Sequence, residues 1–110
     1  MKRQHLSQTE LMVMLAILRL GPEAYGVPIA EEIRKRSGRE LAIGVVYSTL
    51  SRLEEDALVR SETGAATAAR GGRAKTYFES TAKGLKQVRE TQRALQSLWN
   101  GIPQLRSDSA

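Results

Sequence analysis

The stretch 44–79 joins a helical pattern to a hairpin pattern with no linker between them. It reads VVYSTLSRLEEDAL, β-prone VRSET, a Gly-rich turn GAATAARGGRAK, and β-prone TYFE. The turn carries Arg70, Arg73 and Lys75, and no acidic residue occurs over 64–78. A reading helix followed directly by a basic hairpin can present two elements to one strip of duplex DNA. The order predicts a mainly α fold with a small β-hairpin wing, the winged helix-turn-helix class.

The helix of this stretch has one apolar face. Val46, Leu50, Leu53 and Ala57 recur at spacings of four, three and four, which places them on one side of an α-helix. We expect these side chains to point away from that side: Val45, Ser48, Thr49 and Arg52. Hydroxyls and guanidinium groups suit contacts with phosphates and base edges. The alternative is an ordinary amphipathic surface helix, but its acidic cluster 54–56 leaves the first two turns free of acids.

The predicted wing comprises strands near 59–63 and 76–79 around a loop of 12 residues. Glycines in that loop allow positive φ angles and close backbone approach. Unopposed cations at Arg70, Arg73 and Lys75 favour contact with phosphates or the minor groove. A flexible surface turn is the alternative. No phosphate-binding glycine motif is present.

The composition limits the classes of protein. With 110 residues, 41% of them hydrophobic, the chain forms one domain with a small core, for which a partner subunit is the default expectation. The net charge of +5 favours a polyanionic partner, and charge alone does not separate nucleic acid from an anionic membrane surface. The absence of cysteine excludes disulfides and cysteine-bound zinc, and it suits the cytoplasm.

The N-terminal segment predicts a buried helix and not a leader or membrane span. Ser7 and Glu10 form a capping-box pattern before an apolar run, and Gly21-Pro22 end the helix at about Leu20. The run lacks a small-residue cleavage site and is too short to span a bilayer. Because this helix is apolar on nearly every side, we expect a second subunit to cover one face.

A second helix is expected from about 26–28 to 37–38, with Ile29, Ala30 and Ile33 inward. Its cluster Arg34, Lys35 and Arg36 is expected to be a solvated face, with phosphate contact as the alternative. The short apolar run 40–43 predicts a third small strand beside the wing.

The last helix is expected from Thr81, as N-cap, to about 100–101. Its seam has heptad spacing and comprises Leu85, Val88, Gln92, Leu95, Trp99 and Ile102. One seam requires one partner, which is either the first helix of the same chain or a second subunit. The sequence thus divides into a DNA-binding domain (1–80), a dimerisation helix (81–103) and a disordered tail (104–110).

Catalytic and metal chemistry is not expected. His5 is the single histidine, and it has no His or Cys partner for a metal or a nucleophile relay. The carboxylates fall at helical spacings beside Lys and Arg, as on solvated faces. We therefore expect no enzyme activity, no cofactor and no metal.

The residues resemble the PadR family of bacterial transcription regulators over 11–102. The resemblance is carried by LRLGPEAYGVPIAEEIRKRSG, VVYSTLSRLEEDALV and GGRAKTYFESTAKG. Ser48 and Ala82 stand where the family commonly has Pro, and Asp56-Ala57 replaces a usual Gly-containing turn. These departures affect local geometry without removing a charge from the DNA face.

The resemblance implies a short-form homodimer, usually a repressor, that binds a pseudopalindromic operator in double-stranded DNA. The DNA-contacting residues would be Tyr47, Ser48, Thr49, Arg52, Arg70, Arg73 and Lys75. The last helix would pack across a twofold axis on the first helix of the other subunit. That interface would comprise Leu11, Leu15, Leu85, Val88, Leu95, Trp99 and Ile102.

Two matters stay open at this point. Trp99 is core packing or, as the resemblance to drug-responsive members implies, lines a cavity between subunits for a flat aromatic effector. The whole chain is a specific regulator or a nonspecific winged-helix module, with a membrane-surface protein as a distant third class. The sequence does not give the operator.

Overall fold

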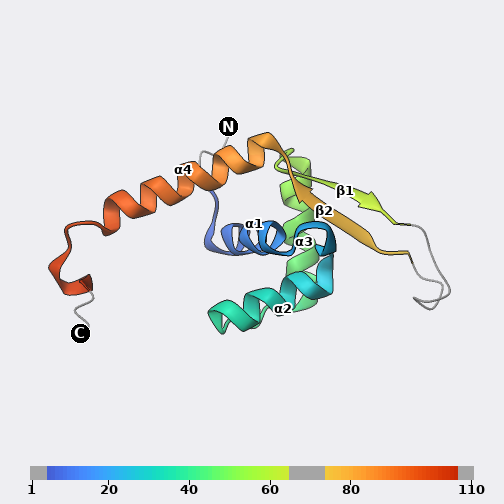
Figure 1. The fold of residues 1–110 in the computed structure, drawn as a ribbon, viewed down its shortest axis with the longest axis horizontal. Coiled ribbons are helices and arrows are strands. Elements are labelled where there is room, and N and C mark those ends of the chain that lie inside the picture. Colours follow the sequence, from blue (N-terminus) through green and yellow to red (C-terminus); the bar gives the residue numbers. More distant parts are fainter. Residues whose placement is uncertain (1–4, 65–73, 107–110) are drawn as a thin grey trace.

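The computed structural model describes residues 5–64 and 74–106. Its helical elements are α1 (Gln8–Leu20), η1 (Gly21–Glu23), α2 (Gly26–Ser37), α3 (Ile43–Glu55), α4 (Ala82–Trp99) and η3 (Pro103–Leu105). The strands β1 (Val59–Thr63) and β2 (Thr76–Ser80) pair antiparallel as a hairpin. Figure 1 shows the hairpin leaving the helical body on one side and α4 on the other. The described fold is a winged helix-turn-helix body with an extended last helix.

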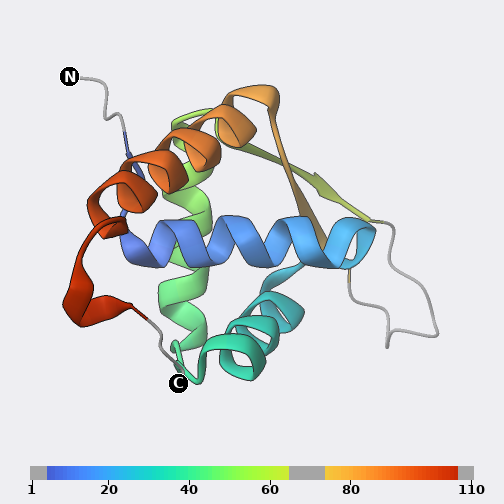
Figure 2. The ribbon, with the colours of Figure 1, turned by 60° about the vertical axis from the view of Figure 1, so that its left-hand side comes forward.

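The core lies where α1, α2 and α3 meet the base of the hairpin. Figure 2 shows α1 crossing α3, with α2 below and α4 above. The apolar spacing of each element supplies buried residues to this one cluster, including Val13 and Met14 from α1, Ile29 from α2, Leu50 from α3 and Phe78 from β2. Burial of these side chains supplies most of the driving force for folding.

The predicted start and end of the first helix and the predicted start of the last helix are confirmed. Ser7 and Glu10 form both hydrogen bonds of the capping box at the start of α1, which ends at Leu20. The N-cap of α4 is Thr81, whose Oγ1 accepts a hydrogen bond from the Gly84 N–H at 3.0 Å. Local capping chemistry therefore sets the start of both the first and the last helix.

The prediction of a third strand over 40–43 is wrong. Within the described ranges, β1 and β2 are the only strands, and α3 already begins at Ile43 with Ala42 as its N-cap. The backbone that lies beside β2 is instead that of Ala24. The Ala24 carbonyl accepts a hydrogen bond from the Phe78 N–H at 2.8 Å. A run of four residues is too short to show by its pattern which segment lies on a sheet edge.

Two smaller predictions also differ from the structure. Ala57 does not continue the apolar stripe of α3, because the helix ends at Glu55 and Ala57 is an exposed residue with a φ of 62°. The tail predicted to be disordered from Gln104 begins with a turn, since Gln104 and Leu105 belong to η3. Its remainder, 107–110, lies outside the described residues.

Candidate nucleic-acid interface

The recognition helix α3 is fixed by one buried face and presents the opposite face to solvent. Val46, Leu50 and Leu53 are buried as predicted. The opposite face is a line at helical spacing that comprises Gly44, Ser48, Ser51 and Glu55, all exposed. Ser51 was not among the predicted contacts, although its position seven residues after Gly44 places it on this line. The outward face therefore has small side chains over its first turns.

The two predicted hydroxyl residues of α3 have different surroundings. Ser48 is exposed, and its hydroxyl donates to the Val45 carbonyl at 3.1 Å. Thr49, which we predicted to face away from the core, is only 2% exposed, and its hydroxyl donates to the same carbonyl at 2.7 Å. The prediction for Thr49 is wrong because the buried face is wider than the stripe 46, 50 and 53, and a polar group facing the core satisfies itself on its own helix.

Tyr47 lies on the flank of α3 that faces the start of α2. Its ring is half exposed, and it packs so closely on Gly26 that a Cβ there would lie 2.4 Å from Tyr47 Cζ. A side chain at position 26 would require the Tyr47 ring to move. Tyr47 thus links α3 to the start of α2 while part of its ring stays at the surface.

Arg52 lies on the other flank, toward the start of α1. Its Nη1 is 3.9 Å from Oε2 of Glu10, a carboxylate that is only 2% exposed, and its own side chain is 52% exposed. The guanidinium therefore has an acidic partner within its own chain and still reaches solvent.

The acidic end of α3 is turned toward the hairpin. Ser61 Oγ on β1 donates to Glu54 Oε2 at 2.7 Å. The carboxylate of Glu54 is thus engaged by the hairpin, which keeps this charge away from the first turns of α3.

The base of the wing is tied to the start of α2 by aromatic side chains. The rings of Tyr25 and Tyr77 meet edge to face, with centroids 5.4 Å apart and planes at 72°. Lys75 Nζ lies 4.7 Å from the centroid of the Tyr25 ring, a cation–π geometry. Lys75 is therefore held at the root of the wing. The other two predicted wing cations, Arg70 and Arg73, lie outside the described residues.

The basic cluster on α2 is exposed, which is compatible with both alternatives, a solvated face and phosphate contact. Arg34, Lys35 and Arg36 are all exposed, and Arg36 Nε donates to Glu32 Oε2 at 2.8 Å. This hydrogen bond lowers the pKa of Glu32 below its usual value. The pair has i,i+4 spacing on one helix, and it stabilises the protein little because it is solvent-screened.

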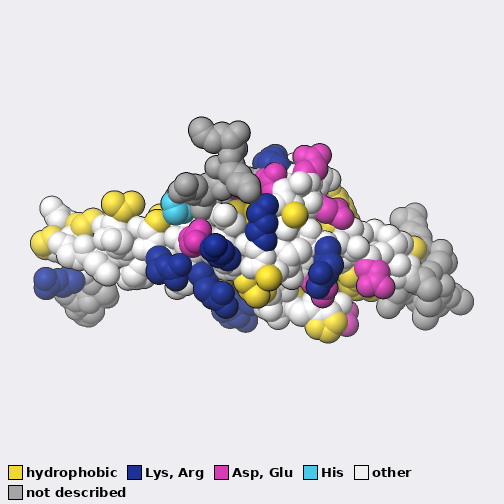
Figure 3. All heavy atoms as spheres, turned by 90° about the horizontal axis from the view of Figure 1, so that it is seen from above, with side chains coloured by type: hydrophobic (Ala, Val, Ile, Leu, Met, Phe, Trp, Pro, Cys, Tyr) yellow, Lys and Arg dark blue, Asp and Glu magenta, His cyan; other side chains and the backbone are white. Residues whose placement is uncertain are grey.

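The predicted seam of α4 is buried only in its first half. Val88 is buried and Leu85 is half-buried, whereas Leu95, Trp99 and Ile102 are exposed, Trp99 by 59%. Packing within one chain therefore does not bury the second half of the seam. Figure 3 shows hydrophobic side chains at the end of the molecule where α4 leaves the body. On α1, Leu11 is half-buried and Leu15 is exposed.

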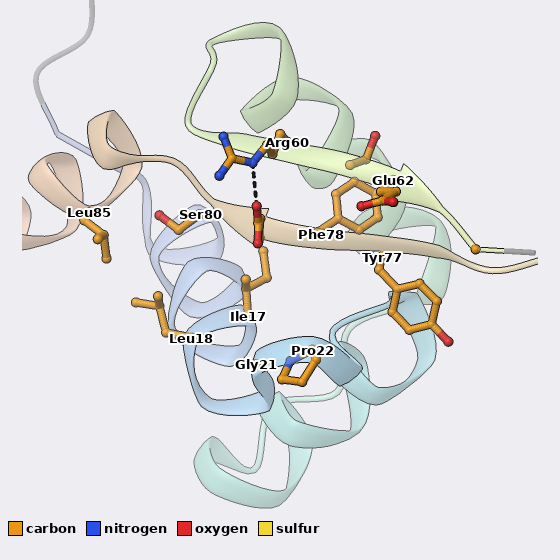
Figure 4. Close-up of a pocket in the computed structure, with 13 residues that line it drawn as sticks. Ile17, Leu18, Gly21, Pro22, Arg60, Glu62, Tyr77, Phe78, Ser80 and Leu85 are labelled. Carbon is orange, nitrogen blue, oxygen red and sulfur yellow. Dashed lines mark hydrogen bonds and ion pairs between the residues drawn. The ribbon is translucent and has the colours of Figure 1, made fainter.

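A pocket of about 700 Å³ lies where the hairpin meets α1 and α4 (Figure 4). Ile17 and Leu18 of α1 and Leu85 of α4 line its apolar side, and the ion pair between Arg60 and Glu79 lines the hairpin side. Both charged side chains are largely exposed. This face of the hairpin is thus not covered by the helices of its own chain.

The described residues contain neither a candidate metal-binding cluster nor a candidate membrane-spanning helix. Over 5–64 and 74–106, no group of three or more His, Cys, Asp or Glu side chains could hold a metal ion. No helix in these ranges is both long and apolar enough to cross a bilayer.

Comparisons with known proteins agree with this geometry. The transcriptional regulator PadR-like family matches residues 14–90. A PadR family transcriptional regulator from Eggerthella lenta superposes with a TM-score of 0.70 at 25% identity, over 91% of this chain and 85% of that one. A PadR-like transcription factor from Bacteroides fragilis gives a TM-score of 0.70 at 28% identity, over 82% of each chain.

A PadR-like regulator from Bacillus cereus shares the fold, with a TM-score of 0.64 at 22% identity, over 86% of this chain and 93% of that one. The search of curated proteins found no match. The family match covers most of the described helices and the hairpin. The chain therefore belongs to the PadR-like family of transcriptional regulators, and its general function is DNA-binding regulation of transcription.

Proposed function

We propose that this protein is a homodimeric repressor that binds a pseudopalindromic operator in double-stranded DNA. The outward line of α3, centred on Ser48 and Ser51, would enter the major groove, flanked by Tyr47. The wing would contact the adjacent backbone through Lys75, Arg73 and Arg70. Such a protein acts in the cytoplasm, where the chromosome lies.

The observation that carries this proposal is the uncovered apolar half of α4. Leu95 and Trp99 are large apolar side chains on one seam of α4, Ile102 follows the end of that helix, and all three are exposed in the single chain. Leu15 and Leu18 form a second exposed apolar set on α1. A monomeric protein rarely exposes such contiguous surface, and a twofold partner would bury one set against the other.

Repression follows from occupancy. A dimer that covers two half-sites excludes other proteins from the same DNA without any additional contact surface. Half-sites about one helical turn apart would match the twofold symmetry of the dimer.

A flat aromatic effector is a second element of the proposal. Trp99 is exposed beyond the body, so its ring and that of the twofold mate would be free to line a cavity between subunits. Titration with flat aromatic cations would quench its fluorescence saturably if that cavity exists. A linear, unsaturable response from a proven dimer would leave Trp99 as packing.

A gel-shift competition separates the specific regulator from the nonspecific winged-helix module. The competitor is random duplex, and the probe is a sequence selected by the protein from a random pool. Retention of the probe at a large excess of competitor supports a regulator. If random duplex displaces the probe as well as an unlabelled copy of the selected sequence does, the protein is a nonspecific module.

A further inference from the structure

The contacts of the buried Glu10 carboxylate include two groups of different kinds. Its Oε1 accepts a hydrogen bond from the Ser7 N–H at 2.8 Å, which closes the capping box of α1. Its Oε2 lies 3.9 Å from Nη1 of Arg52 on the recognition helix. Capping requires only an acceptor oxygen and no charge, because glutamine serves equally well at this position. The negative charge of Glu10 can therefore act on Arg52.

Glu10 lies in a buried part of the molecule, near the start of α1. The Leu6 N–H just before α1 donates to Thr91 Oγ1 of α4 at 2.9 Å, and both residues are buried. Thr49, three residues before Arg52, is buried on the same flank of α3. Glu10 is therefore surrounded by protein, whereas the side chain of Arg52 reaches solvent.

The pair leaves most of the guanidinium unused. At 3.9 Å the contact is an ion pair without a direct hydrogen bond, and the Arg52 side chain is 52% exposed. A guanidinium has five N–H donors, so Arg52 can approach a phosphate while it remains near Glu10. It also lies beside the outward line of α3 and not on it, a position suited to the backbone at the edge of a groove.

We propose that Arg52 is a phosphate contact and not a base-reading residue, and that the negative charge of Glu10 weakens the attraction of Arg52 to the DNA backbone. In the free protein the buried carboxylate takes the place of a DNA phosphate beside the guanidinium. Binding to DNA then places a phosphate near a cation that is already partly neutralised, which weakens sequence-independent attraction. This inference rests on the proposed binding of DNA by α3.

The test uses Glu10→Gln, which removes the charge and keeps the capping acceptor. We expect binding to random duplex and to the selected sequence to tighten, each by about two- to tenfold, with a steeper salt dependence. In an Arg52→Ala background the same substitution should have a much smaller effect, because the cation that Glu10 neutralises is gone. Arg52→Ala alone should weaken binding to both duplexes by a similar factor and reduce the salt slope by about one.

Glu32→Gln is the matched control. It also removes one negative charge and releases one arginine, Arg36, but both residues lie on α2. Its effect should be the same whether residue 52 is arginine or alanine. Thermal denaturation of each variant shows whether the fold is kept, and Arg52→Ala tests the pair from its exposed side if Glu10→Gln is unstable.

Two results would overturn the inference. The first is that Glu10→Gln changes DNA binding equally with and without Arg52. The second is that Arg52→Ala weakens only the selected sequence and spares random duplex, which would make Arg52 a base reader. Failure of the wild-type protein to prefer any sequence would refute the proposed operator binding, but the random-duplex measurements would still test this inference.

Discussion

The ring of Tyr47 occupies the space in which a side chain at Gly26 would lie. A Cβ on Gly26 would be 2.4 Å from both Cζ and Oη of that ring. Gly26 opens α2 and Tyr47 belongs to the second turn of α3, so this contact joins the two helices of the helix-turn-helix.

Gly26→Ala should therefore displace Tyr47 and shift α3 relative to α2. We expect a loss of unfolding free energy of about 1–3 kcal/mol from overpacking, together with weaker binding to the selected sequence. Thermal denaturation and gel shift measure the two effects. Gly44→Ala is the control for thermal denaturation only, because a Cβ there meets nothing within 4 Å and alanine favours the helix by about 0.5–1 kcal/mol. A stable Gly26→Ala with normal DNA binding would show that the contact is easily relieved.

Ala57→Gly should stabilise the protein. Ala57 has a φ of 62°, a left-handed conformation that costs an L-residue with a Cβ about 1–2 kcal/mol and glycine almost nothing. The greater freedom of glycine in the unfolded chain offsets part of this gain, so we expect about 1 kcal/mol and a rise in Tm of several degrees. Gly38→Ala is the converse variant, since Gly38 has a φ of 77° and open space around it. An unchanged or lower Tm for Ala57→Gly would contradict the strained turn.

The strengths and failures of prediction from the sequence have physical causes. The capping box at Ser7 and Glu10 and the N-cap at Thr81 were predictable because these signals lie within three residues of the helix end they set. The turn at Ala57 was wrongly predicted as a continuation of the helix, because the apolar side chain of Ala57 fits the helical spacing. The left-handed backbone angle of this residue leaves no pattern in the sequence.

The sequence predicted which face of α3 is exposed, but it did not predict the long-range contacts of the candidate site. The exposure of Ser48 follows from periodicity alone. The pairing of Arg52 with Glu10 joins residues 42 positions apart, and the burial of Thr49 depends on how α1 lies against α3, so neither is visible in local spacing.

The wing should contribute sequence-independent affinity. Replacing Arg73 and Lys75 with alanine should weaken binding to the selected sequence and to random duplex alike. The salt slope should fall by about one for each phosphate that the variant no longer neutralises. Measurement of the dissociation constants over a range of salt concentrations checks this. An unchanged salt slope would mean that these cations do not face DNA.

The contact of Lys75 with Tyr25 predicts a separate effect. Tyr25→Leu removes the ring beneath Lys75 Nζ and the edge-to-face contact with Tyr77, while all the charges stay in place. We expect a modest loss of stability, about 1 kcal/mol, and weaker DNA binding with a nearly unchanged salt slope. A large drop in the slope would mean that the lysine itself had left the DNA backbone.

Trp99→Ala should shift the protein toward monomer. If the exposed ring is buried by a partner subunit, its loss should cost on the order of 3 kcal/mol of association free energy, or about 100-fold in the dimer dissociation constant. Sedimentation over a range of concentrations measures this. Arg93→Ala is the control, because Arg93 is exposed on α4 one position beyond the seam residue Gln92. If the wild-type protein, Trp99→Ala and Arg93→Ala sediment equally, Trp99 does not belong to the interface.

Two copies of the chain are proposed to read DNA together through α3 and the wing. Hydroxyl-radical footprinting on the sequence that the protein selects from a random pool tests this most directly. We expect two protected half-sites related by a dyad, with centres about one helical turn, 10–10.5 base pairs, or a small multiple of it apart. A single asymmetric footprint, or a pool from which no sequence is enriched, would contradict paired reading by a dimer.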